Sequence, residues 1–148
     1  MKVAVLLSGC GVYDGSEIHE SVFALLALAQ NNLDYVCVAP NIKHHHVINH
    51  LSGEESFEER NVLVESARIA RGDVISVEDF DFDSASALVI PGGFGAAKNL
   101  SDWAFNGPSS SVLEEVRELI LLFLKKKKPV VSLCISPTLI AKSLEKSG

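Results

Sequence analysis

Hydrophobic and polar residues alternate along the chain in blocks that predict strands separated by helices. Continuous apolar runs, as expected of parallel strands buried on both faces, occupy residues 2–8, 34–40, 87–93 and 129–134. Apolar residues at helical spacing predict helices over residues 17–31 and 61–72, and a longer one that runs from about residue 111 to a group of lysines at 125–128. A short strand is expected within residues 73–80. This order predicts an α/β fold with a mainly parallel sheet and right-handed crossovers.

The expected helices carry start signals and apolar faces. In the first helix, the apolar positions at helical spacing are Ile18, Val22, Leu25, Leu26 and Ala29. In the long helix, Ser111 and Glu114 have the spacing of a capping box. Its apolar stripe consists of Val112, Val116, Leu119, Ile120 and Phe123. Pro137 is expected to open the last helix, where its missing N–H has no cost.

Ligands of such sheets bind outside the carboxyl ends of the strands. Three of these ends are chemically unusual, with the sequences SGCGVYDGSE, PGGFGAAKN and SLCISP, and they are expected to converge. The glycines invite a nucleotide-binding interpretation. However, Asp14 stands where the last glycine of G-x-G-x-x-G belongs, and the residues beside Lys98 break the P-loop pattern.

Composition narrows the classes of function. The 148 residues fit one domain, and a net charge of −6 disfavours a nucleic-acid partner. The longest apolar runs are far shorter than the roughly 20 residues that span a bilayer, so no membrane segment is expected. The three cysteines are odd in number and widely spaced, which fits neither a disulfide framework nor a zinc pattern. We therefore expect a cytoplasmic protein, or one of an organelle matrix if a targeting segment is missing.

Cys134 stands at the joint between the last strand and the last helix. Small residues two positions to either side, Ser132 and Ser136, fit a nucleophile elbow, and a helix N-terminus favours the thiolate form. The alternative is a buried structural cysteine, and the local pattern alone does not decide between the two. Cys37 lies in mid-strand and is expected in the core. Cys10 lies at a strand end, where it either packs or lines the site.

Several segments resemble one protein family. LCISPTLI is similar to the elbow of the superfamily that contains the PfpI-type proteases and the class I glutamine amidotransferases. LLSGCGVYDGSEIHE, VINHLSGE, RNVLVESARIARG and VIPGGFGAAKNLS resemble its ElbB branch, the isoprenoid-biosynthesis amidotransferase-like family. The resemblance covers nearly the whole chain. It implies a flavodoxin-like three-layer sandwich and one amidotransferase-like domain over residues 1–148, expected to be incomplete at the C-terminus, after the elbow helix.

The resemblance also assigns site residues. Cys134 matches the nucleophile and Glu17 the acid that approaches it, and the backbone N–H groups of Gly93 and Ile135 match an oxyanion hole. A carboxyl beside a thiolate is expected to have a raised pKa, so Glu17 should hold a proton and lie within hydrogen-bond reach of the sulfur. Four further residues are expected to line the site: Gly92, Cys10, Asn99 and His50.

The departures from the family bear on function. Ile135 stands where PfpI-type proteases carry a histidine, and no histidine follows Cys134, which disfavours a Cys-His hydrolase. The resemblance implies a glyoxalase-type thiol enzyme that needs no cofactor or metal, acts on a small carbonyl substrate and forms a homodimer. A redox-sensing or regulatory binding protein that uses an oxidisable Cys134 is the alternative, and an amidotransferase-type hydrolase is a third. The histidines at 44–46 are interpreted as a solvated loop.

Overall fold

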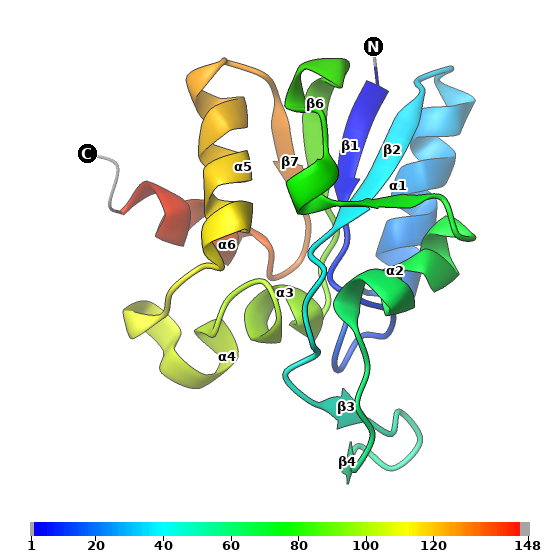
Figure 1. Cartoon of the computed structure of the whole chain (residues 1–148), viewed down its shortest axis with the longest axis vertical. Helices are drawn as coiled ribbons and strands as arrows, with labels where there is room; N and C mark the ends of the chain where they lie inside the picture. The colour runs from blue at the N-terminus through cyan, green and yellow to red at the C-terminus, as the bar shows by residue number, and fades with distance from the viewer. Residues whose placement is uncertain (1, 146–148) are drawn as a thin grey trace.

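A sheet of five parallel strands forms the centre of the computed structural model, which describes residues 2–145 (Figure 1). Its spatial order is β5-β2-β1-β6-β7, and the direction of winding reverses between β1 and β6. The strands are β1 (Lys2–Leu6), β2 (Tyr35–Ala39), β5 (Val74–Ser76), β6 (Ala85–Ile90) and β7 (Val130–Ser132). Ligand sites in α/β sheets lie at such a reversal, beyond the carboxyl ends of the strands. The predicted parallel sheet is confirmed.

Helices cover both faces of the sheet. Side chains of α1 (Ile18–Gln30) and α2 (Val62–Ala70) pack on one face, and those of α5 (Glu114–Lys125) and α6 (Pro137–Leu144) pack on the other. This is the flavodoxin-like three-layer sandwich that the sequence predicts. The remaining elements are short: α3 (Phe94–Lys98), α4 (Trp103–Asn106), the antiparallel pair β3 (Val47–Ile48) and β4 (Glu55–Ser56), and three 3-10 turns at Val77–Asp79, Phe82–Ser84 and Gly107–Ser109. Within residues 2–145, no helix has the length and apolar character needed to cross a membrane.

The rotation of α1 about its axis differs from the sequence prediction. Ile18, Val22 and Leu26, three of the predicted apolar positions, are 43%, 45% and 48% exposed. The side chains that pack on the sheet are Ala24, Leu25 and Leu28. The helix is apolar on most of its circumference, so hydrophobic spacing does not determine which side meets the sheet. This rotation decides which acidic residue of the helix reaches the site.

The beginning of α5 also differs from its prediction. The helix starts at Glu114, and no side chain caps it. The backbone N–H and hydroxyl of Ser111 instead donate to the carboxylate of Asp102, at 2.6 and 3.4 Å. The predicted capping box is therefore wrong, because Ser111 donates to Asp102, the N-cap residue of α4, instead of capping α5. The predicted apolar stripe is confirmed, since all of its members are buried: Val112, Val116, Leu119, Ile120 and Phe123.

Candidate active site

Cys134 occupies the turn between β7 and α6, where the sequence predicts a nucleophile elbow. Its φ of 55° lies in the left-handed region, which costs a non-glycine residue free energy and persists only where the surroundings enforce it. Two hydrogen bonds to the end of β6 hold the turn: Leu133 N–H donates to the Ile90 carbonyl at 3.0 Å, and the buried Ser136 hydroxyl donates to the Pro91 carbonyl at 2.6 Å. The strained turn leaves Cys134 exposed to solvent.

Glu20, from the first turns of α1, lies beside this cysteine. Its carboxylate accepts a hydrogen bond of 2.7 Å from the Gly92 N–H. A Cβ added to Gly92 would lie 2.4 Å from the Cys134 Cβ and 2.6 Å from Glu20 Oε2. The carboxylate and the cysteine therefore meet at the missing side chain of Gly92, and only glycine leaves room for both. Sequence reasoning placed Gly92 at the site but missed Glu20.

The structure places Glu17 at the start of α1. It is the N-cap of α1, where one carboxylate oxygen accepts from the Glu20 N–H at 2.7 Å and the other pairs with His19 Nδ1 at 2.9 Å. Burial acts to raise the pKa of Glu17, but the hydrogen bonds from His19 and from the Glu20 N–H outweigh it, and the pKa lies below its usual value. The predicted raised pKa of Glu17 is therefore wrong.

The two predicted oxyanion donors border the same place. Gly93 directly follows Gly92 and has a φ of 96°, and a Cβ there would lie 2.4 Å from both the Glu17 nitrogen and the Gly15 carbonyl oxygen. Ile135 directly follows the cysteine. Among residues 2–145, neither the Gly93 nor the Ile135 N–H donates a hydrogen bond, so both are free to bind an oxygen of a substrate.

The other predicted site-lining residues support the loops. Asn99 is buried: its amide donates to the Ser8 and Asp14 carbonyls at 2.9 and 2.8 Å, and its side-chain oxygen accepts from the His45 N–H at 2.9 Å. His50 Nε2 accepts from the Tyr13 N–H at 3.2 Å, and the two rings stack. Cys10 is half-buried, and burial raises the pKa of its thiol, with the Glu65 charge acting in the same direction. The contacts of Asn99 and His50 tie the β1–α1 loop to the end of α3 and to the segments before and after β3.

Comparison with known proteins identifies relatives. No protein-family model matches the chain. "ES1 protein homolog, mitochondrial" of Rattus norvegicus is 46% identical over 145 residues, and the human "Glutamine amidotransferase-like class 1 domain-containing protein 3, mitochondrial" is 45% identical over 144 residues. Each match covers 97% of this chain and 54% of the relative, so the chain spans about half the length of these curated relatives.

A solved structure is also similar. The isoprenoid biosynthesis protein with amidotransferase-like domain from Ehrlichia chaffeensis has a TM-score of 0.94 and 41% sequence identity, over 100% of this chain and 70% of that chain. The chain belongs to this amidotransferase-like family. This membership agrees with the amidotransferase-like part of the resemblance seen in the sequence.

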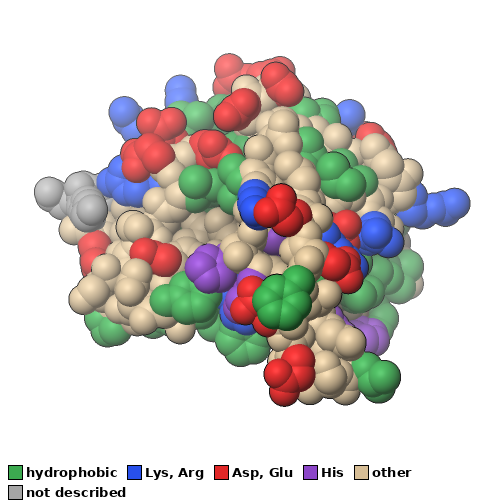
Figure 2. Space-filling model, turned by 60° about the horizontal axis from the view of Figure 1, so that its bottom comes forward, with side chains coloured by type: hydrophobic (Ala, Val, Ile, Leu, Met, Phe, Trp, Pro, Cys, Tyr) green, Lys and Arg blue, Asp and Glu red, His purple; other side chains and the backbone are tan. Residues whose placement is uncertain are grey.

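One histidine of this amidotransferase-like chain, His44, is buried, although a solvated loop is predicted there. His44 is only 4% exposed, and neither of its ring nitrogens has a hydrogen-bond partner among the described residues. The ring lies where a Cβ of Gly9 would be, 2.6 Å from His44 Cε1. Burial lowers the pKa of His44, and it also lowers that of the neighbouring His46. No group of three or more His, Cys, Asp or Glu residues within 2–145 is arranged to hold a metal ion. Figure 2 shows histidines on the face formed by the carboxyl-end loops.

We expect the free energy of unfolding to fall as the pH drops below about 6.5, the usual pKa of histidine. The unfolded chain takes up a proton on His44 there, whereas the folded state, with its lower pKa, does not. Each unit between the two pKa values contributes about 1.4 kcal/mol. In urea unfolding, the free energy of unfolding of His44→Leu should therefore fall less steeply below that pH than that of the unmodified protein. Part of the fall should remain, because burial also lowers the pKa of His46. His19→Gln, at a side chain 79% exposed, is the control. An unchanged slope in His44→Leu would contradict this account.

Proposed function

We propose that the chain is the nucleophile-bearing part of a cofactor-independent thiol enzyme of the ElbB branch, which converts small reactive carbonyls such as glyoxal to hydroxy acids. The observation that carries the proposal is the meeting of the Glu20 carboxylate and Cys134 at Gly92. A nucleophile, an adjacent proton carrier and two free N–H donors are the parts that such a reaction needs. Glu20 replaces Glu17 as the acid.

The reaction needs no external oxidant or reductant. The Cys134 thiolate attacks one aldehyde carbon of glyoxal, a C–S bond forms, and the oxygen gains a proton to give a hemithioacetal. The free N–H groups of Gly93 and Ile135 stabilise the charge on that oxygen as it develops. Glu20 then takes the proton from this carbon and delivers it to the neighbouring one. The first carbon is thereby oxidised and the second reduced, which yields a glycolate thioester. Water cleaves the C–S bond and releases glycolate and the free thiol.

Cys134→Ser should reduce glyoxal turnover to the background rate, because a serine hydroxyl in this setting lacks the nucleophilicity of a thiolate. The measurement is glycolate formation by metal-free protein at neutral pH. Cys37→Ser is the matched control, since Cys37 lies buried in β2 and burial raises its pKa to about 11. Turnover that persists in Cys134→Ser, or that is absent from the unmodified protein, would overturn the proposal.

A redox role is the second candidate, and the exposure of Cys134 favours it. Solvent exposure and thiolate character promote oxidation of a cysteine to sulfenic or sulfinic acid. In that case, peroxide treatment should add oxygen to Cys134 in the peptide mass spectrum while glyoxal is not consumed.

The names of the rat and human relatives contain "mitochondrial", which supports an organelle matrix as the place of action.

A further inference from the structure

A cavity of about 140 Å³ lies where α5 begins, and α6 contributes one of its walls. Its lining residues are Ser110, Ser111, Val112, Glu114, Arg117 and Lys142. One water molecule needs only about 10–15 Å³ of such space, so the cavity has room for a small polyatomic ligand. None of these residues takes part in the site around Cys134.

Hydrogen-bond donors without acceptors gather at this cavity. Ser110 is only 6% exposed, and its hydroxyl has no hydrogen-bond partner among the described residues. The Arg117 Nε–H is buried and unpartnered in the same way. The start of α5 adds more donors, because no side chain caps it and the first N–H groups of a helix lack partners within the helix. Native proteins leave few buried polar groups unsatisfied, so several in one place indicate a missing partner.

The charged residues that line the cavity are two cations, Arg117 and Lys142, and one carboxylate, that of Glu114. Lys142 has a side chain only 9% exposed, and its ammonium donates to the Pro108 carbonyl and pairs with Glu145, which leaves one N–H of three. The positive end of the α5 dipole points to the same place. Glu114 opposes binding, but its carboxylate is 70% exposed and engages Arg117 at Nη1, at 3.3 Å, leaving Nε free.

We propose that this cavity binds a tetrahedral oxyanion, either free phosphate or the phosphate group of a small metabolite. The ligand would accept hydrogen bonds from the Ser110 hydroxyl, the Arg117 Nε–H and the first N–H groups of α5. A tetrahedral anion offers several acceptor oxygens, which matches a site built of donors that converge from two residues and a helix N-terminus.

The test is a titration of the protein with inorganic phosphate and, separately, with glycerol 3-phosphate. Binding is followed by the backbone amide shifts of Ser111, Glu114 and Glu115. We expect saturable shifts of these amides with at least one of the two ligands. Binding of both shows that the site accepts a phosphate ester, and binding of inorganic phosphate alone shows a site for the free ion. Shifts that do not saturate with either ligand overturn the proposal.

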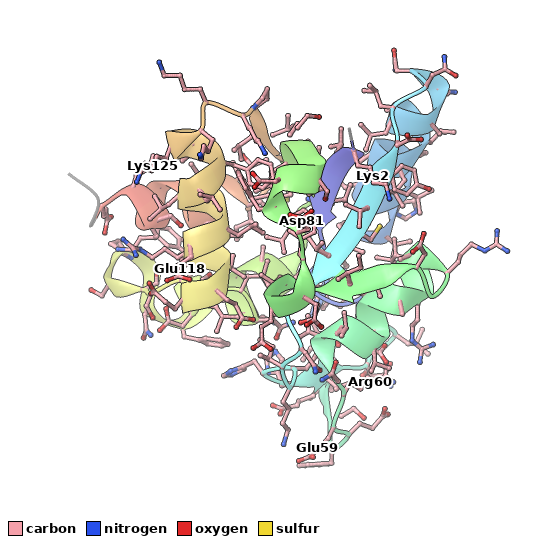
Figure 3. All side chains as sticks on the ribbon, turned by 45° about the horizontal axis from the view of Figure 1, so that its top comes forward. Lys2, Glu59, Arg60, Asp81, Glu118 and Lys125 are labelled. Carbon is pink, nitrogen blue, oxygen red and sulfur yellow. The ribbon has the colours of Figure 1, made fainter. Side chains whose placement is uncertain are left out.

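Matched variants distinguish a site from a general charge effect. Arg117→Gln should weaken binding at least about tenfold, because one charge-assisted hydrogen bond is lost. Lys125→Gln, at the other end of α5, should leave it unchanged (Figure 3). Glu114→Gln should tighten binding, whereas Glu118→Gln, one turn further along the same helix, should not. Equal effects within either pair would contradict the site.

Ser110→Ala gives a result that a purely structural role would not. It removes a buried hydroxyl without a partner, so the unfolding midpoint without phosphate should stay equal or rise. The affinity for phosphate should fall severalfold at the same time. A loss of stability with unchanged affinity would show that Ser110 has a packing role and would overturn its assignment to the site.

Discussion

Glu20→Gln is expected to lower glyoxal turnover by about 100-fold or more while the fold is retained, because general acid–base catalysis typically contributes 10²–10⁴-fold. Glutamine keeps the size of the side chain and an oxygen that can still accept from the Gly92 N–H, at present a bond of 2.7 Å. It loses the ability to take up and deliver a proton. The rate of glycolate formation under saturating glyoxal measures the effect. A circular dichroism spectrum unchanged from that of the unmodified protein confirms that the chain remains folded.

Glu17→Gln is the matched control for this experiment, three residues earlier in the chain. The Glu17 carboxylate caps α1 and pairs with His19, so its loss should cost stability of less than about 1 kcal/mol and leave turnover within a few-fold. The two variants should therefore show opposite patterns. Glu20→Gln loses turnover and keeps stability, whereas Glu17→Gln loses a little stability and keeps turnover. If Glu17→Gln loses more turnover than Glu20→Gln, the acid of the proposed mechanism is the wrong one.

The strands, the parallel sheet and the turn at Cys134 could be predicted from the sequence because each has a local physical cause. Buried parallel strands must be apolar on both faces, which produces uninterrupted runs such as the one that ends in β6. The elbow needs small neighbours, and Ser136 shows why: its side chain is fully buried and tied to the Pro91 carbonyl, where a larger residue has no room. Pro137 opens α6 as predicted.

The position of the acid could not be predicted in the same way. α1 is apolar on most of its surface, so the hydrophobic spacing selected Ile18, Val22 and Leu26, which the structure exposes. The side that meets the sheet contains Ala24 and Leu28, and Glu20 lies four residues before Ala24 on that same side. The sequence did contain a signal for Glu20. Glu17 and Glu20 have the spacing of an N-cap residue and its N3 partner, which predicts that Glu17 caps the helix and that Glu20 lies inside its first turn.

The burial of His44 and the free start of α5 depend on contacts between distant segments. His44 is covered because Gly9, in the β1–α1 loop, has no side chain. α5 lacks its cap because Asp102, nine residues before Ser111, accepts from both the backbone N–H and the hydroxyl of Ser111. Neither pairing leaves a periodic trace in the sequence. The burial of His44 links stability to pH. The uncapped start of α5 leaves hydrogen-bond donors without acceptors.

Gly92→Ala is expected to abolish turnover through one added methyl group. That Cβ would lie 2.4 Å from the Cys134 Cβ, 2.6 Å from Glu20 Oε2 and 3.1 Å from the Leu133 carbonyl oxygen. The glutamate can swing aside, but the Cys134 Cβ is fixed to the strained turn and cannot yield without moving the backbone. Overpacking of this kind costs about 1–3 kcal/mol. It also drives the carboxylate and the thiol apart, and a misplacement of about 1 Å can cost 100-fold in rate.

Gly53→Ala separates this effect from the general cost of replacing a glycine. Gly53 has a φ of 77° and nothing within 4 Å of an added Cβ, so alanine there strains the backbone without touching any neighbour. It should lose about 1–2 kcal/mol of stability and keep full turnover. Alkylation of Cys134 by iodoacetamide, read by peptide mass, adds a measurement that does not depend on the substrate. Its rate should change in Gly92→Ala and not in Gly53→Ala, and equal rates in both would mean that Gly92 does not hold the thiol and the carboxylate together.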